Sequence, residues 1–360
     1  MRSTNKSLSS NKPMFVKKLT LRDFRNHHSK SFNFEPGINI VTGPNASGKT
    51  NIVESIYYLS LARSFRGVED NELVRKGFEY GVIEATIMEG KIKRDIQILI
   101  TKKGRSVVVN GKKVSKISEL SKVVNVLLFE PKDVMLFKGS PKDRRNFLDI
   151  NLSKKYPVYL EYISNYNKAL ANRNDILKNE KVDEKLLEST TELLVKYSAP
   201  IVEYRTRYVK DITDILIKIT RALTGEESKI RIDYKPFVTP STNFESEALE
   251  AFKRSLDSDL KHKATSIGVH REDFSVSLND KEIDIYGSQG ENRMIALALK
   301  ISPYFLIEDK DKRPIIVLDD VMSELDKKHR KRLVELLRKL GQVFITATEL
   351  EIDGAAHIKL

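Results

Sequence analysis

The sequence predicts an α/β fold in which a helical insertion divides a domain built on a parallel sheet. An apolar run at residues 38–41 leads into a glycine-containing loop and a helix-compatible segment, the order of a β-loop-α unit. Residues 314–318 form a second continuous apolar run, typical of strands covered by helices on both faces. Between the two runs, glycine is absent from Leu152 through Thr224, and apolar residues recur at three- and four-residue steps, which is typical of helices.

Residues 14–151 are expected to form the N-terminal part of the divided domain, including an antiparallel β subdomain. Its first strands are predicted at residues 15–21 and 37–41, ahead of the loop and its helix. A β-rich stretch follows from Gly81 to Val114, with turns indicated by Glu89-Gly90, Lys103-Gly104 and Asn110-Gly111. The Asn-Gly pair suits a type I′ hairpin turn.

Residues 152–265 are expected to form an arm of antiparallel helices. A helix of about 30 residues spans on the order of 45 Å, so the arm is short. Its apolar stripe favours packing within the molecule over a groove for a partner. Residues 266–360 return to a β/α texture and complete the divided domain, with strands predicted at 274–278, 314–318 and 343–346. The polar residues 1–13 are expected to be a disordered extension.

Composition narrows the class of partner. The formal net charge is +13, which favours a polyanion over a cationic partner, although a lysine-rich surface also serves solubility. The chain has no cysteine, which excludes disulfides and thiolate metal sites and fits a reducing cytosol. No run of about 18 apolar residues is present, and the N-terminus lacks a signal-peptide pattern. A cytoplasmic protein without a membrane span is therefore expected.

Residues 43–50 form a complete G-x-x-x-x-G-K-[ST] phosphate-binding loop. Its glycines let successive backbone N–H groups curl around a phosphate, and the following helix adds the positive end of its dipole. Lys49 is expected to reach the β- and γ-phosphates, and Thr50 to ligate Mg²⁺. The strand-loop-helix context disfavours a chance glycine loop. ATP and Mg²⁺ are the expected cofactors, and the phosphates would be held by Gly43, Pro44, Asn45, Ala46, Ser47, Gly48, Lys49 and Thr50.

The second motif is the apolar strand at residues 314–318, which ends in Asp319 and Asp320. In a parallel sheet this acidic end falls at the carboxyl edge, where ligands bind. Asp319 is then placed to hold Mg²⁺ through water, and Asp320 to orient or deprotonate an attacking water. An apolar strand that ends in two aspartates is weak evidence of a catalytic role when it stands alone. It is strong evidence of one when the chain also has an intact phosphate-binding loop.

Two further motifs flank the acidic strand. Residues 288–291, Ser-Gln-Gly-Glu, open a predicted helix and resemble the signature motif of ABC-type ATPases. Residues 323–326, Ser-Glu-Leu-Asp, resemble their D-loop, with Asp326 as its last member. In ABC-type ATPases two heads sandwich two nucleotides, so Ser288 and Gly290 would face a γ-phosphate bound to the other head. A plain helix cap at Ser288 stays open as the alternative.

The resemblance becomes specific at this point: the chain resembles the RecF family of SMC-like ABC-type ATPases. The match runs from about residue 14 to the C-terminus. The block at residues 138–149, Lys-Gly-Ser-Pro…Arg-Arg…Phe-Leu-Asp, is the part least expected in a generic ATPase. The other supporting stretches are residues 21–26, 129–133, 268–273 and 318–326.

The RecF resemblance implies an ABC-type P-loop ATPase head split by a short coiled-coil-like arm. It implies a weak, DNA-stimulated ATPase in which ATP joins two heads into a homodimer and hydrolysis separates them. Gapped or junction DNA would be the partner, together with RecR- and RecO-type mediators that help load the recombinase onto single strands. An ABC-type subunit coupled to a non-DNA partner such as a transporter stays as the alternative.

Several positions depart from the family pattern or keep an open role. Ala46 stands where glycine is frequent, and Glu291 where glutamine is common. Thr346 occupies the place of the switch histidine of transporter ATPases, and a threonine does not titrate near neutral pH. No clear Q-loop glutamine is present, so Glu130 or Asp133 is expected to fill that role.

The basic residues are harder to assign. His270-Arg271 is interpreted equally well as a structural pair or as a nucleotide sensor. Arg25, Arg63 and Arg66 lie near the nucleotide-binding segments in sequence, but ordinary surface positions are favoured. The candidate DNA contacts are lysines and arginines of the arm and of the β-rich stretch, namely Lys91, Lys93, Arg94, Lys102, Lys103, Arg105, Lys112 and Lys113.

Overall fold

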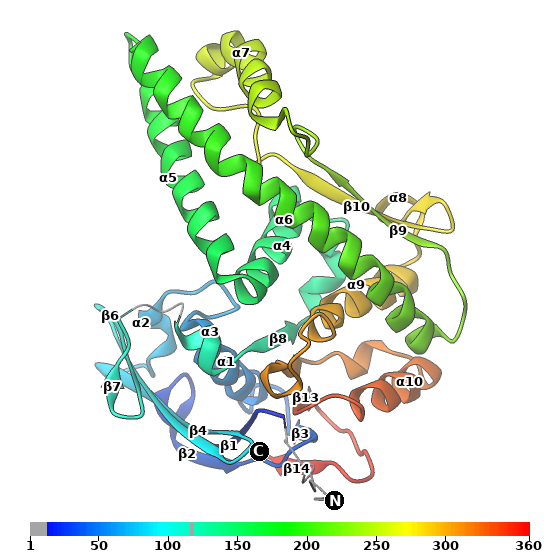
Figure 1. Cartoon of the computed structure of the whole chain (residues 1–360). Coiled ribbons are helices and arrows are strands. Elements are labelled where there is room, and N and C mark those ends of the chain that lie inside the picture. The colour runs from blue at the N-terminus through cyan, green and yellow to red at the C-terminus, as the bar shows by residue number, and fades with distance from the viewer. Residues whose placement is uncertain (1–12, 116–118) are drawn as a thin grey trace, which may run out of the picture. The chain divides into compact units, whose positions relative to one another are not determined.

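The computed structural model describes residues 13–115 and 119–360, so the extension expected at residues 1–13 lies outside them apart from Pro13. The chain forms two compact units, drawn together in Figure 1. The head unit comprises the chain up to Asp133, with Ala222–Gly225 and Lys300–Leu360. The arm unit comprises Val134–Arg221 and Glu226–Leu299.

A five-stranded parallel sheet forms the centre of the head unit. Its strands lie in the order β14-β3-β13-β12-β8, and every neighbouring pair is parallel. The apolar side chains of β3, β12 and β13 are all buried, as expected for strands covered on both faces of a sheet. Parallel strands end at a common edge, so the loops after β3, β13, β12 and β8 meet there. The strand bounds are β3 Ile38–Thr42, β8 Val126–Phe129, β12 Ile315–Leu318, β13 Val343–Ala347 and β14 Ala356–Lys359.

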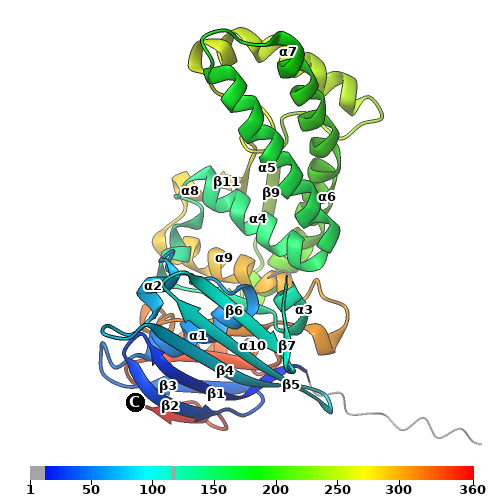
Figure 2. The ribbon, with the colours of Figure 1, turned by 90° about the vertical axis from the view of Figure 1, so that its left-hand side faces the viewer.

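A six-stranded antiparallel sheet makes the second layer of the head unit, in the order β2-β1-β4-β5-β6-β7. Figure 2 shows this sheet towards the viewer. Buried and exposed side chains alternate along β5, so one face is packed and the other is solvated. All three predicted turns join antiparallel strands: Glu89-Gly90 lies between β4 and β5, Lys103-Gly104 between β5 and β6, and Asn110-Gly111 between β6 and β7. The bounds are β1 Phe15–Phe24, β2 His27–Asn33, β4 Tyr80–Glu89, β5 Ile92–Thr101, β6 Gly104–Val109 and β7 Lys112–Lys113.

One hydrophobic core joins the two sheets and helix α1, Lys49–Leu61. Ile52, Val53 and Ile56 of α1 are wholly buried there, beside Val41 of β3 and Phe344 of β13. This packing fixes the start of α1 relative to the end of β3. The shorter elements of the head unit are α2 Asp70–Leu73, α3 Leu120–Val123, η3 Ser302–Tyr304, η4 Lys310–Lys312, η5 Met322–Glu324 and α10 Lys327–Leu337; η2, Pro131–Leu136, crosses into the arm unit.

The arm unit is built on an antiparallel pair of helices, α5 (Pro157–Lys178) and α6 (Glu184–Thr224). Near the tip, Arg173 Nε donates to Thr191 Oγ1 at 2.9 Å. Near the base, the rings of Tyr159 and Tyr204 meet edge to face with centroids 5.8 Å apart. At 41 residues, α6 is longer than predicted, about 60 Å. In the described parts of the chain no helix combines the length and apolarity needed to cross a membrane.

Two strand assignments made from sequence need correction. Residues 152–265 contain a strand, β9 (Ile230–Lys235), where only helices were expected. The strand predicted at 274–278, β10 (Asp273–Leu278), pairs with β9 in a three-stranded sheet of the arm unit, not with the head sheet. β9 alternates apolar and charged residues over six positions, a pattern masked by the helical texture around it. The other elements are β11 Lys281–Glu282, α4 Pro141–Lys155, α7 Phe244–His262, α8 Ile283–Tyr286 and α9 Gln289–Ile301.

A buried charge network explains why the compact units do not coincide with the predicted boundaries after residues 151 and 265. Arg205 of α6 is 1% exposed. Its guanidinium donates to Asp149 of α4 at 2.8 Å and to Glu272 at 2.7 Å. Arg144 of α4 pairs with Asp273 through two 2.7 Å bonds. Buried charges are tolerated only when paired, so these bonds hold residues 141–155 and 266–278 to the helices. Much of the distinctive block at residues 138–149 therefore serves the arm's internal structure.

Candidate nucleotide-binding site

The phosphate-binding loop lies between β3 and α1, as its sequence context predicts. Gly48 ends the loop with φ 104°, a left-handed conformation that favours glycine. A Cβ at Gly48 would also lie 2.7–2.8 Å from side-chain atoms of Asn26 and His27. Ala46, which replaces a frequent glycine, likewise has a positive φ of 65°. The close packing around Gly48 therefore holds the loop against the turn between β1 and β2.

The loop contains donors directed at its own interior. Lys49 Nζ donates to the carbonyl oxygens of Gly43 and Pro44, each at 2.8 Å. The buried Ser47 Oγ has no hydrogen-bond partner in the part of the chain that the structure describes. An ammonium group held by neutral carbonyls and an unsatisfied hydroxyl both suit an anionic oxygen ligand. The residues present therefore fit a phosphate group.

Asp319 lies at the carboxyl end of β12, next to the loop. Its Oδ1 accepts hydrogen bonds from Thr50 Oγ1 at 3.1 Å and from Thr346 Oγ1 at 2.7 Å. Burial raises the pKa of Asp319, while the two hydroxyl donors act in the opposite direction. The sheet order explains the contact, because β13 lies between β3 and β12 and Thr346 is on β13.

A hydroxyl and a carboxylate oxygen at this spacing suit Mg²⁺, which keeps several waters and takes its other ligands from phosphates. Among the described residues, no group of three or more histidine, aspartate and glutamate side chains could hold a metal ion by itself. The contact between Thr50 and Asp319 would suit a cation that takes its other ligands from water and phosphate.

Asp320 follows directly and is exposed to solvent. Its backbone has a φ of 51°, and its N–H donates to Thr346 Oγ1 at 2.9 Å. Ser323 Oγ donates to the carbonyl oxygen of Asp320 at 2.9 Å and to its Oδ1 at 3.1 Å. These bonds orient the carboxylate away from the core, so water can reach it. That geometry suits the predicted role of a general base.

Asp326 caps the N-terminus of α10. Its Oδ1 accepts from the backbone N–H of His329 at 2.9 Å, and its Oδ2 lies 2.6 Å from His329 Nδ1. These hydrogen bonds lower the pKa of the carboxyl. The side chain is 62% exposed, so Asp326 is available at the surface as a D-loop residue is expected to be.

Ser288 and Gly290 lie in the arm unit at the start of α9. Ser288 Oγ accepts from the Glu291 N–H at 3.2 Å, and the Ser288 N–H donates to Glu291 Oε2 at 2.8 Å. This is a capping box, so the helix-cap interpretation of Ser288 holds. The structure is also compatible with the interpretation of these residues as a signature motif, because Ser288 and Gly290 are exposed and the space around the Gly290 Cα is open. The hydrogen bonds between Ser288 and the Glu291 carboxylate lower the pKa of Glu291.

A buried carboxylate that sequence reasoning missed lies on α1. Glu54 is wholly buried one turn after Thr50. Arg25 donates to both of its oxygens, at 2.7 and 2.9 Å, and Ser64 Oγ donates at 2.5 Å. Arg66 Nη1 lies 3.9 Å from Glu54. The surface interpretation of Arg25 is therefore wrong. The sequence did contain a sign of this contact, because Glu54 is an acidic residue within the apolar face of the helix that follows the loop.

Glu130 and Asp133 follow β8, the neighbour of β12 in the sheet. Burial raises the pKa of Glu130, whose Oε1 pairs with Lys132 Nζ at 2.8 Å. Asp133 accepts from the Glu130 N–H at 3.0 Å and pairs with Lys300 Nζ at 2.6 Å. Glu130 therefore lies at the same edge of the parallel sheet as Asp319. Its role as the Q-loop residue stays a prediction.

His270 is a structural residue of the arm unit. Its Nδ1 lies 2.7 Å from Tyr166 Oη, and its Nε2 lies 3.1 Å from the Thr265 carbonyl oxygen. Burial lowers the pKa of His270 to about 4. Because both ring nitrogens are engaged inside the unit, the structural interpretation is favoured over the sensor.

The basic β-stretch does not form one patch. Three of its eight candidates are paired with carboxylates: Lys93 with Asp95 at 2.8 Å, Arg94 with Glu89 at 2.9 Å and Arg105 with Asp70 at 3.0 Å. The strand register places the exposed Lys91, Lys112 and Lys113 at one end of the sheet and the exposed Lys102 and Lys103 at the other. A duplex lying along one end would meet only part of the set.

A hollow of about 330 Å³ adjoins the phosphate-binding loop. The turn between β1 and β2 contributes Asn26, the start of β2 contributes His27 and His28, and the loop contributes Ser47. Burial lowers the pKa of His27, whose ring faces the Gly48 carbonyl oxygen at 3.3 Å. The hollow is large enough to take part of a nucleotide whose phosphates lie in the loop.

Comparison with known proteins agrees with this geometry. Residues 15–356 match the family model described as the RecF/RecN/SMC N terminal domain. The chain is 34% identical over 354 residues to the DNA replication and repair protein RecF of Bacillus cereus (strain G9842) and to that of Bacillus thuringiensis (strain Al Hakam). Each alignment covers 96% of this chain and 94% of the relative.

Solved structures give the same result. The recombination mediator protein RecF with ATP, in the RecFOR pathway, aligns with a TM-score of 0.90 and 32% identity. That alignment covers 98% of this chain and 97% of the other. The Smc head domain of Pyrococcus furiosus shares the fold, with a TM-score of 0.56 and 17% identity. The fold is that of an ABC-type ATPase head with an antiparallel sheet and a helical insertion, and the chain belongs to the RecF family of the RecF/RecN/SMC group.

Proposed function

We propose that this protein is an ATP-switched DNA-binding protein of recombinational repair and replication. Two copies would close on ATP, hold DNA at gaps or junctions, and help load a recombinase onto single-stranded DNA. The observation that carries the proposal is the convergence of Thr50, Asp319 and Thr346 beneath an intact phosphate-binding loop, in a chain of the RecF family.

The head unit's residues divide the nucleotide chemistry among them. Lys49 would leave the loop carbonyls for the β- and γ-phosphates, and Ser47 Oγ would gain an acceptor. Thr50 and Asp319 would hold Mg²⁺, which neutralises phosphate charge. Asp320, exposed and oriented by Ser323, would take the proton of the attacking water.

Dimerisation would use the exposed start of α9. Ser288 Oγ and the backbone N–H groups at the helix N-terminus are donors for a γ-phosphate bound by a second copy. The open space at Gly290 would let that nucleotide approach the backbone. ATP then contributes contacts that ADP lacks, so hydrolysis would favour separation of the copies.

The positive balance of the chain, 63 Lys and Arg against 50 Asp and Glu, supports DNA as the partner. RecR- and RecO-type mediators are the expected protein partners, since the similar solved structures are described as belonging to the RecFOR pathway. The protein and these partners would then act together on chromosomal DNA in the cytoplasm. The transporter-coupled alternative lacks such support, because Thr346 replaces the switch histidine and family membership is with RecF.

Fluorescence anisotropy with labelled gapped DNA tests the proposal. The titration is run with no nucleotide, with ADP and with a non-hydrolysable ATP analogue, each at two salt concentrations. We expect the analogue with Mg²⁺ to tighten binding. Affinity should fall log-linearly with salt, since phosphate contacts dominate. Sequence preference should be weak, because few base contacts are expected.

Lys49→Met serves as the control, because it should keep basal DNA binding and lose the response to the analogue. Equal affinity in every nucleotide state would reject the switched clamp. ATP turnover that gapped DNA leaves unchanged would count against the DNA-stimulated ATPase.

A further inference from the structure

The helix α10 of the head unit and the two residues after it concentrate positive charge. Residues 327–339 hold seven Lys and Arg against one Glu, a net charge of +6. The whole chain of 360 residues has a net charge of +13, so nearly half of its excess lies in this one segment. Figure 1 labels α10 near the C-terminal end of the colour scale.

Two of the seven cations have a structural place inside the head unit. Arg330 Nη2 donates to the carbonyl oxygens of Met322 at 2.8 Å and Leu325 at 3.2 Å, in the turn before α10. The guanidinium of Arg332 lies against the backbone of Gly225, where a Cβ would collide with it. The other five cations are exposed, namely Lys327, Lys328, Lys331, Arg338 and Lys339.

The exposed cations of α10 lie on one side of the helix. At 3.6 residues per turn, Lys327, Lys331 and Arg338 fall within about 40° around the axis, and Lys328 lies beside them. We call these four residues the basic face of α10, which is about 16 Å long. Glu335 is the one acidic side chain on it. The apolar side chains of the opposite side are buried, namely Leu333, Leu336 and Leu337.

The lysines of the basic face do not stabilise their own helix. Lys327 and Lys328 form its first turn, which contains no acidic residue, and the positive end of the helix dipole disfavours cations there. In the part of the chain that the structure describes, no ion pair or hydrogen bond engages the ammonium groups of Lys327, Lys328 or Lys331. Lys93 of the β-rich stretch is, in contrast, paired with Asp95 at 2.8 Å. The charges of the basic face are therefore available to an anionic partner.

We propose that the basic face of α10 binds the phosphate backbone of duplex DNA. The inference rests on the proposed function and names a surface for the DNA outside both the β-rich stretch and the arm. Phosphates of one strand are spaced about 3.4 Å along the duplex axis, so a face about 16 Å long can meet three or four of them. Contacts of this kind hold the duplex without reading its bases.

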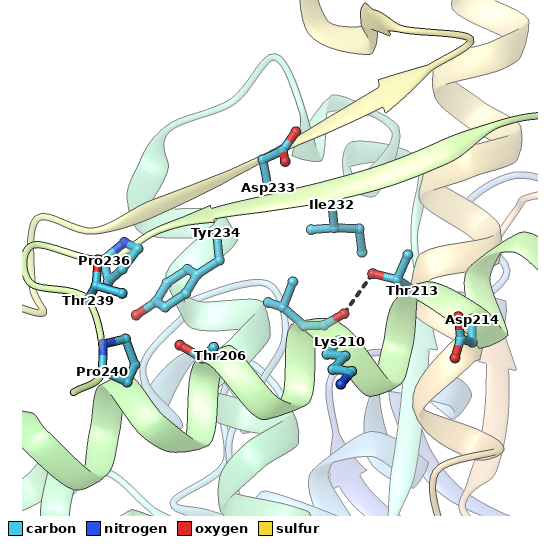
Figure 3. A pocket seen from close by; sticks show the side chains of 11 residues that line it. Thr206, Lys210, Thr213, Asp214, Ile232, Asp233, Tyr234, Pro236, Thr239 and Pro240 are labelled. Carbon is cyan, nitrogen blue, oxygen red and sulfur yellow. Dashed lines mark hydrogen bonds between the residues drawn. The ribbon is translucent and has the colours of Figure 1, made fainter. Parts of the chain in front are cut away.

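The chemistry of the basic face favours a nucleic acid over a protein or a membrane. The large apolar side chains that are exposed in the described parts of the chain all lie outside residues 327–339. A protein interface has an apolar centre, and a helix that lies on a membrane needs an exposed apolar face. The groove of about 510 Å³ between α6 and β9 shows the contrast, because its lining combines Lys210 with Asp214 and Asp233 (Figure 3). Such mixed charges do not select a polyanion.

The test compares two triple variants of the full chain by fluorescence anisotropy with labelled gapped duplex DNA. The α10 variant combines Lys327→Gln, Lys328→Gln and Lys331→Gln. The control variant changes the net charge equally at exposed lysines of the head unit outside α10, and combines Lys17→Gln, Lys18→Gln and Lys76→Gln. Titrations are run without nucleotide and with a non-hydrolysable ATP analogue, from about 50 to 200 mM salt.

We expect the α10 variant to bind the DNA at least about tenfold more weakly than wild type at the lowest salt. Its plot of log affinity against log salt should be shallower by about two to three, because each phosphate contact contributes about 0.9 to the slope. The control variant should keep the affinity and slope of wild type. The melting temperature of the α10 variant should not fall, because glutamine removes unfavourable charge from the helix N-terminus.

Lysine acetylation of the wild-type protein, followed by peptide mass spectrometry, locates the contact independently. Gapped DNA should slow the acetylation of Lys327, Lys328 and Lys331 several-fold and leave that of Lys17 and Lys18 unchanged. A poly-glutamate peptide of the same total charge should protect the α10 lysines less, because its charges are spaced more widely than those of duplex DNA.

The proposal is overturned if the α10 and control variants bind DNA with the same affinity and slope, or if DNA leaves the acetylation of the α10 lysines unchanged. Protection by poly-glutamate equal to that by DNA would also overturn it and assign the basic face to an acidic protein. In all these results wild type still binds the DNA, so the proposed function stands. Failure of wild type to bind gapped DNA at any salt concentration would instead reject the proposed function together with this surface.

Discussion

Thr346 Oγ1 donates a 2.7 Å hydrogen bond to Asp319 Oδ1 and joins the central strand β13 to the acidic end of β12. The same oxygen accepts from the Asp320 N–H at 2.9 Å. A single hydroxyl therefore contacts both residues of the acidic motif, the carboxylate of Asp319 and the backbone of Asp320. A histidine at this place would offer a titrating group, whereas the threonine offers a fixed donor and acceptor at neutral pH.

Thr346→Val should lower the rate of ATP hydrolysis at least about tenfold and destabilise the fold by roughly 1–3 kcal/mol. The valine keeps the shape of a side chain that is 1% exposed but leaves the Asp320 N–H without its acceptor. Steady-state phosphate release and urea unfolding measure the two effects. Thr346→Ser retains the hydroxyl and is the control, so equal losses in both variants would exclude the hydrogen bonds as the cause.

Asp320→Asn should bind ATP and hydrolyse it at least about a hundredfold more slowly, because the amide cannot take a proton from water. The variant should accumulate as an ATP-bound dimer. Lys49→Met or Lys49→Ala should instead abolish ATP binding, since the β- and γ-phosphates lose their ammonium partner. Binding of a fluorescent ATP analogue and single-turnover hydrolysis separate the two outcomes.

Lys91→Met is the matched control for the lysine substitution, because Lys91 is exposed at a turn of the antiparallel sheet. Turnover by Asp320→Asn at the wild-type rate would show that another group takes the proton.

Ser288→Arg should prevent ATP-driven dimerisation by placing a long cationic side chain where the second copy approaches. The protein alone should be monomeric, and ATP with Mg²⁺ should double its mass by light scattering. Because Ser288 also caps α9, the arginine variant loses a cap worth about 1 kcal/mol. Ser288→Thr keeps the capping oxygen and should dimerise.

Ser288→Ala loses the cap without adding bulk. A strong defect in Ser288→Ala equal to that of Ser288→Arg would assign the effect to the lost hydroxyl rather than to steric exclusion. An unchanged mass with and without ATP in the wild-type protein would contradict the dimer itself.

His270 should make the stability of the arm depend on pH. Its pKa is lowered by burial from 6.5 to about 4, so the unfolded chain takes up a proton at a pH where the folded protein does not. Stability should be complete above pH 6.5 and fall as the pH drops towards 4, by up to about 3 kcal/mol. Below the folded pKa both states are protonated and no further loss follows from this group.

Urea unfolding at a series of pH values measures this slope. In His270→Gln the slope between pH 6.5 and 4 should be shallower, even though the variant is less stable at pH 7.5. His262→Gln changes an exposed histidine near the end of α7 and should leave the slope unaltered. Identical slopes in wild type and His270→Gln would remove His270 as the cause.

The local sequence was enough to predict the elements that carry the nucleotide chemistry. The β-loop-α unit at residues 38–61 and the apolar strand before Asp319 are encoded in short contiguous patterns. The resemblance to the RecF family was also recognisable from motifs, and with it the ABC-type head and its helical insertion. Such features depend on residues that are neighbours in the chain, where residue type limits backbone conformation directly.

Tertiary structure alone decided which distant groups meet. Thr50 and Asp319 are 269 positions apart, and the hydrogen bonds of Thr346 follow from the place of β13 between β3 and β12. The strand β9 was missed because its pairing with β10 overrides the helical texture of its surroundings. The boundary of the arm was likewise set by Arg205, whose buried charge requires Asp149 and Glu272 as partners. A contact of this kind depends on the order of strands and the packing of helices, which no local pattern of residues specifies.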